Sequence, residues 1–225
     1  SRLPYLYDNS TFQRLVRNRK TDFNWSYQYI IPNRYISRKL ELFRHKYFID
    51  KYIIGVHYRG TDKFANNGDN EDLKSNTHLS YDKVIIKIRQ YILDLKKNND
   101  IVENTIVIFV ASDEQPFIDT MRLHFNNIVS YDTSRSSANT SNILLDTIDC
   151  KSDTDTEKCR ELRVYQNLSI HRGNNNISAY KKGEDAVMDI WLLSSCHIMF
   201  KTQAGNFSSQ PARINSKLQV IQVEA

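Results

Sequence analysis

Polar side chains that could bind or activate a ligand follow the apolar segments that have the composition of buried strands. The most distinctive run comes after Ile53–Val56, where His57, Tyr58 and Arg59 lead into Gly-Thr-Asp-Lys. Three later apolar segments also end in polar runs: Ser112-Asp113-Glu114, Asp132-Thr133-Ser134-Arg135 and Thr202-Gln203-Ala204-Gly205-Asn206-Phe207-Ser208-Ser209. One such run is often a turn or a helix cap, whereas four together favour a ligand site.

The types of these residues suit a phosphorylated ligand. Arg59 carries a permanent charge and a planar pair of donors, which match a diphosphate. The run from Thr202 to Ser209 is a turn of small residues that enters a predicted helix, where backbone N–H groups and serine hydroxyls could bind phosphate. Simpler interpretations stay open: His57 as a packed strand-end histidine, Asp113 as a helix N-cap, and Arg59 as the partner of an internal carboxylate.

The segments that must position these residues alternate between strand and helix. Short β-branched runs predict strands at residues 53–58, 105–111, 127–131, 197–201 and 218–223. Longer runs of helical period predict helices at about 80–97, from Gln115, at 184–195 and at 209–214. Strands separated by helices pair in parallel, so we expect an α/β fold with a Rossmann-like open parallel sheet. Ligands of such sheets bind beyond the carboxyl ends of the strands, where the polar runs lie.

The predicted organisation is a short, mostly helical segment at residues 1–50 followed by one nucleotide-binding domain at residues 51–225. Apolar residues predict one helix near Leu15 and a second after Pro32. A stretch rich in Asn, Ser, Thr and Asp predicts a surface loop at about residues 134–165. The chain begins without Met, and we expect it to be part of a longer multidomain protein.

Composition excludes several classes of protein. The 225 residues are 40% hydrophobic and 25% charged with only six Gly and four Pro, which excludes a disordered chain. No apolar run is long enough to span a membrane. The net charge of +5 arises in residues 1–60, which suits an anionic ligand, a nucleic acid or simply a solvated basic face. The absence of a helix-turn-helix, RRM or KH pattern counts against nucleic acid.

Cysteine and asparagine patterns leave the compartment open. Cys150, Cys159 and Cys196 have no metal-ligand spacing, so we expect no metal site. Cys150 and Cys159 could form a local disulfide or remain two free thiols. Six N-x-S/T sequons could indicate a secretory lumen, but the chain is rich in all three residue types. Golgi or secretory lumen and cytoplasm therefore both remain possible.

Several nucleotide-binding and hydrolase classes lack their motifs in this chain. No G-x-G-x-x-G follows the first predicted strand, and neither G-x-x-x-x-G-K-[ST] nor G-x-S-x-G occurs. These absences disfavour an NAD-type site, a P-loop NTPase and an α/β-hydrolase. Transfer from a nucleotide sugar is the large remaining class.

The run Gly55-Val56-His57-Tyr58-Arg59-Gly60-Thr61-Asp62-Lys63 resembles the G-[VI]-H-x-R-x-T-D-K signature of GDP-fucose-dependent fucosyltransferases. That superfamily comprises α1,6-, nodulation and protein O-fucosyltransferases. Further segments resemble the family in the same order: Val110–Glu114, Lys182–Ser194 and Phe207–Ser209, with Ser134–Ser136 and Ser169–His171 similar to its "HYRGTDK" subgroup. The resemblance covers about residues 50–223.

The resemblance implies the C-terminal, donor-binding half of a GT-B glycosyltransferase. The implied reaction is inverting transfer of L-fucose from GDP-β-L-fucose to an oligosaccharide or glycoprotein acceptor, without a metal or other cofactor. Arg59 matches the arginine on the β-phosphate, and Asp189 matches the aspartate that binds guanine. The other implied donor-site residues are His57, Asp113, Arg135, His171, Asn206, Phe207, Ser208 and Ser209.

Two departures from the family leave parts of the site uncertain. The family's catalytic glutamate would fall near Asn67, so we favour Glu71 as the general base, with Asp69 as a second candidate. Gly60 stands where the α1,6 enzymes have a second arginine. A transferase for another nucleotide sugar and a non-catalytic nucleotide-sugar or glycan-binding module therefore remain as alternatives.

Overall fold

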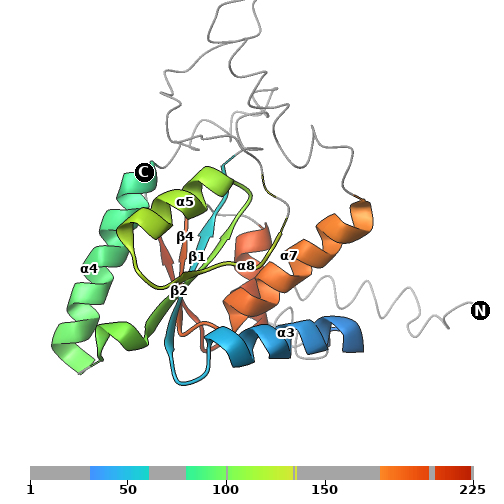
Figure 1. Ribbon diagram of the computed structural model, residues 1–225, viewed down its shortest axis with the longest axis horizontal. Coiled ribbons are helices and arrows are strands. Elements are labelled where there is room, and N and C mark those ends of the chain that lie inside the picture. The colour runs from blue at the N-terminus through green and yellow to red at the C-terminus, as the bar shows by residue number, and fades with distance from the viewer. Residues whose placement is uncertain are drawn as a thin grey trace, which may run out of the picture.

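The computed structural model describes residues 31–60, 80–99, 101–133, 135, 178–202 and 206–223. Five parallel strands form one open sheet in the order β3-β2-β1-β4-β5. The strands are β1 (Tyr52–Tyr58), β2 (Ile106–Ser112), β3 (Ile128–Val129), β4 (Ile198–Lys201) and β5 (Gln219–Gln222). This arrangement confirms the predicted Rossmann-like α/β class (Figure 1).

Within the described residues, five α-helices and one 3₁₀ turn connect or flank the strands. They are α3 (Arg34–Tyr47), α4 (Tyr81–Asn99), the 3₁₀ turn Glu103–Thr105, α5 (Gln115–His124), α7 (Ala179–Ser194) and α8 (Asn206–Ile214). Helix α7 begins five residues before its predicted start, because Ser178 caps it by accepting the Lys181 N–H at 3.2 Å. Strand β3 is shorter than predicted, since only Ile128 and Val129 pair with β2.

The sheet lies between two helical layers, each with its own apolar core (Figure 1). Successive residues of β1 point to opposite faces: Ile54 and Val56 pack with α4 and α5, whereas Ile53 packs with α3 and α7. The side chain of His57 therefore points to the face that α7 covers. Burial on both faces explains why β1 and β2 are continuous apolar runs in the sequence.

Strand order creates a topological switch point beside β1. From β1 the chain proceeds through α4 to β2 and through α5 to β3 on one side, and β4 and β5 lie on the other side. A crevice at the carboxyl ends of the strands is expected where the order reverses, between β1 and β4.

Helix α3 packs on the sheet as part of the α7 layer. Asn33 caps it by accepting the Ile36 N–H at 3.0 Å, and Leu40 is buried beneath it. Lys39 forms an ion pair with Glu184 of α7. Residues 34–47 of the predicted N-terminal segment thus share a core with the parallel sheet and α7.

Gly55 allows the carboxyl end of α7 to lie directly against β1. A Cβ atom built on Gly55 would be 2.9 Å from Cys196 Sγ and 3.1 Å from Leu193 Cδ2. Real Cβ atoms do not approach neighbours this closely, so any larger side chain at position 55 must push the helix away. The small residue therefore sets the distance between α7 and the strand that carries His57 and Arg59.

We expect Gly55→Ala to lower the free energy of unfolding by about 1–3 kcal/mol, because the added methyl group overpacks this contact. The cost should be smaller in a Cys196→Ala background, which removes the nearest atom. Gly183→Ala is the matched control, since a Cβ there meets nothing within 4 Å and should stabilise the helix by up to about 1 kcal/mol. Urea unfolding measures all of these changes, and an equal cost of Gly55→Ala in both backgrounds would contradict the close-contact explanation.

Candidate functional site

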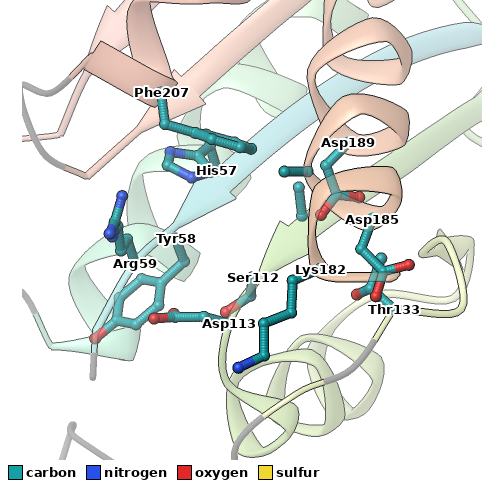
Figure 2. Close-up of a pocket in the computed structure, with 12 residues that line it drawn as sticks. His57, Tyr58, Arg59, Ser112, Asp113, Thr133, Lys182, Asp185, Asp189 and Phe207 are labelled. Carbon is teal, nitrogen blue, oxygen red and sulfur yellow. The ribbon is translucent and has the colours of Figure 1, made fainter. Parts of the chain in front are cut away.

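A cavity opens at the carboxyl ends of β1 and β2, beside α7 and the first turn of α8 (Figure 2). The residues that line it come from five separate parts of the chain: His57, Tyr58, Arg59, Ala111, Ser112, Asp113, Thr133, Lys182, Asp185, Ala186, Asp189 and Phe207. The polar runs predicted to meet at one edge of the sheet therefore do so for β1 and β2.

His57 forms the floor of the cavity with Phe207. The two rings stack with centroids 4.9 Å apart and planes 26° apart. His57 is buried, and its backbone carbonyl accepts the Thr202 N–H at 3.2 Å. These contacts join the end of β1 to the end of β4 and to the start of α8.

Asp113 fixes the backbone just after Arg59. Its Oδ1 accepts the Gly60 N–H at 3.1 Å, so the carboxylate holds the chain where it leaves β1. The N-cap of α5 is Glu114 instead, which accepts the Tyr81 hydroxyl at 2.5 Å. Asp113 is therefore a positioning residue for the Arg59 backbone, and the alternative of a helix cap is not what the structure has.

Asp189 presents a buried carboxylate to the cavity from α7. The residue is 8% exposed, and its Oδ1 has no hydrogen-bond partner among the described residues. Burial raises the pKa of Asp189 to about 8, with a further increase from Asp185 and an opposing decrease from the nearby Arg135. A buried acceptor without a donor is costly, so a ligand that offers N–H groups here would bind favourably.

Arg135 lies behind the cavity lining. Its Nη1 donates to the Thr133 carbonyl at 3.1 Å and its Nη2 donates to the Tyr131 carbonyl. Burial lowers the pKa of this arginine, and the charge of Asp189 opposes that decrease. Arg135 does not line the cavity; its contacts hold the chain after β3, next to Thr133, which does line it, and its role at the donor site stays a prediction.

The first turn of α8 contains the predicted residues Asn206, Phe207, Ser208 and Ser209, and Phe207 lines the cavity. Ser208 is buried at 2% exposed. Asp69, Glu71, His171 and the predicted loop with Cys150 and Cys159 lie outside the described residues.

Sequence reasoning missed Lys182 and Asp185 as site residues. Both lie on α7 in the segment that resembles the family, at spacings of seven and four residues before Asp189. These spacings place side chains on one face of a helix, which was the available signal. Asp185 forms an ion pair with Lys181 at 2.6 Å.

No group of three or more His, Cys, Asp or Glu side chains among the described residues is arranged to hold a metal ion. None of the described helices is both long and apolar enough to cross a membrane.

Comparison with known proteins returned similar folds only. No family model matches the sequence, and no curated protein matches it. A crystal structure of NodZ α-1,6-fucosyltransferase soaked with GDP-fucose aligns with a TM-score of 0.42 and 13% identity over 80% of this chain and 42% of that chain. A crystal structure of fucosyltransferase NodZ from Bradyrhizobium aligns with a TM-score of 0.39 and 12% identity, over 80% of this chain and 41% of that chain. The chain thus spans less than half the length of these proteins.

Ionisation of Asp189 should make the ligand-free chain less stable as pH rises. Its folded pKa of about 8 lies above the value of about 4 expected in the unfolded chain, so the folded state binds the extra proton between these values. We expect the stability of Asp189→Asn relative to wild type to increase by about 2–3 kcal/mol between pH 6 and pH 9. Urea unfolding at both pH values measures this difference.

The matched control is Asp119→Asn in α5, where the carboxylate is more than half exposed. This variant should keep a constant difference from wild type across the same range. Parallel pH profiles for wild type and Asp189→Asn would show that the Asp189 carboxylate is solvated.

Proposed function

We propose that this chain binds a GDP-sugar and is the donor-binding part of an inverting fucosyltransferase. One observation carries the proposal. Four of the six sequence segments that resemble fucosyltransferases are far apart in the chain and contribute lining residues to the same cavity, as in His57, Asp113, Asp189 and Phe207. The carboxyl ends of parallel strands meet in any such sheet, so the strongest support comes from Asp189, which reaches the cavity from within α7.

The buried carboxylate of Asp189 suits guanine. The N1–H and N2–H₂ groups of guanine form an adjacent pair of donors that one carboxylate can accept. In the empty cavity the carboxyl group is hard to ionise, whereas two donors from a bound base would stabilise its charged form. Uracil offers a single N–H between two carbonyl groups and cannot satisfy both oxygens. This argument favours GDP over UDP as the nucleotide.

Arg59 is the residue proposed to act on the diphosphate. It directly follows β1 and lines the cavity beside Asp113. When the sugar leaves, negative charge grows on the β-phosphate oxygen, and a fixed guanidinium stabilises that charge more strongly than it stabilises the ground state. The planar donors of arginine also fit a phosphate in two-point contact.

The general base is proposed to come from the segment after Lys63, with Glu71 favoured and Asp69 second. The carboxylates that line the described cavity have other roles: Asp113 accepts the Gly60 N–H, Asp185 pairs with Lys181, and Asp189 is buried. The same observation supports the alternative of a non-catalytic module that binds a nucleotide sugar. The acceptor is proposed to be an oligosaccharide or glycoprotein, and no metal is needed because the chain supplies its own cation.

GDP and GDP-fucose should stabilise the chain, whereas UDP- and TDP-sugars should not. At ten times the dissociation constant the expected gain is about 1.4 kcal/mol in the free energy of unfolding. A thermal-shift panel with GDP-fucose, GDP-mannose, UDP-glucose and TDP-rhamnose measures the ranking. Equal stabilisation by UDP-glucose would contradict the role given to Asp189, and a preference for GDP-mannose would indicate a different transferase.

Arg59→Ala should lower kcat/KM for fucosyl transfer at least about a hundredfold, a loss of about 3 kcal/mol in transition-state stabilisation. The loss in GDP affinity should be smaller, because the contact strengthens as charge develops. Arg59→Lys retains the charge without the planar donors and should still impair turnover strongly. Steady-state kinetics of the full-length protein measure both variants.

Folding is the control for this experiment. Both Arg59 variants should keep the wild-type circular dichroism spectrum, because a half-buried side chain at the cavity contributes little to the core. Near wild-type transfer by Arg59→Ala, or its unfolding, would mean that Arg59 serves an internal ion pair.

A further inference from the structure

Helix α7 presents a stripe of polar side chains to the cavity. Lys182, Asp185 and Asp189 all line it and recur at intervals of three and four residues (Figure 2). Seven residues separate Lys182 from Asp189, which is about two helical turns and about 10 Å along the axis. That length is comparable to a nucleoside, so a base held at Asp189 would place its phosphates at the Lys182 end.

The ammonium group of Lys182 is available to a ligand. Among the described residues it has no hydrogen-bond or ion-pair partner, whereas Lys39 pairs with Glu184 and Lys181 pairs with Asp185. Glu184 and Asp185, the two acidic residues that follow Lys182 in α7, therefore already have cationic partners. Figure 2 shows the Lys182 side chain extending away from α7 toward the side of the cavity where Asp113 lies.

Binding a nucleoside diphosphate in this cavity would require more positive charge than Arg59 alone provides. Arg59 and Lys182 are the only Lys or Arg side chains among its described lining residues, against the three acids Asp113, Asp185 and Asp189. A nucleoside diphosphate carries at least two negative charges at neutral pH. Position 60, next to Arg59, holds a glycine whose N–H is already bound to Asp113.

We propose that Lys182 is the second cation for the diphosphate and acts from α7, together with Arg59 just after β1. The inference rests on the proposed function, because it requires that the site binds a nucleoside diphosphate. It does not depend on which base or sugar that ligand carries. Lys182 contributes a hydrated point charge to ligand binding. Replacement by Arg should therefore preserve the affinity, whereas replacement by a neutral side chain should lower it.

Lys182→Met tests this assignment, because it keeps an unbranched apolar stem and removes the charge. Calorimetric titration of the 225-residue chain should show about a tenfold loss of GDP affinity, as expected for one charge-assisted hydrogen bond. Affinity for guanosine, which lacks phosphate, should change by less than about twofold. Lys182→Arg should retain most of the GDP affinity. Lys87→Met, on the exposed face of α4 across the sheet, is the matched control and should bind GDP like wild type.

Other results overturn the assignment. Unchanged GDP affinity in Lys182→Met would make Lys182 a solvated surface residue, and equal losses for GDP and guanosine would indicate a structural role. If wild type binds UDP instead of GDP, the guanine proposal fails, and the same comparison with UDP and uridine still tests Lys182. Failure of wild type to bind any nucleoside diphosphate would overturn both proposals.

Discussion

The close contact between α7 and β1 at Gly55 determines the geometry of the site. With no side chain at position 55, Cys196 and Leu193 at the end of α7 lie directly on the strand. The polar stripe of α7, from Lys182 to Asp189, then faces the carboxyl ends of β1 and β2. This contact thus fixes how close the carboxyl end of α7 lies to the strand that leads into Arg59.

Charge pairing around α7 divides its side chains into two groups. Glu184 and Asp185 are neutralised by Lys39 and Lys181, and these pairs fix α3 and the first turns of α7 in place. Asp189 is buried instead, with a raised pKa and an unsatisfied oxygen. A buried acceptor without a donor and a lysine in the same cavity suit the proposed ligand, which has N–H donors at one end and phosphate at the other.

The sequence predicts the sheet well and the site in part. Strands β1 and β2 are buried on both faces, which makes their apolar runs unmistakable, and the polar residues after them are correctly expected at one sheet edge. The early start of α7 was missed because its cap, Ser178, precedes a Lys-rich turn with no apolar period. Arg135 could not be assigned from sequence, since a guanidinium binds a phosphate or backbone carbonyls equally well. Helical spacing puts Lys182 on the same face of α7 as Asp189, but whether that face meets the cavity depends on tertiary packing that local pattern does not encode.

A crystal structure of the chain with GDP tests the central claim most directly. The account predicts the guanine edge within hydrogen-bond distance of the Asp189 carboxylate and the β-phosphate within hydrogen-bond distance of the Arg59 guanidinium. The nucleotide would then lie along α7 at the carboxyl ends of β1 and β2. GDP bound elsewhere on the chain, or bound in this cavity with its phosphates away from Arg59, would contradict it.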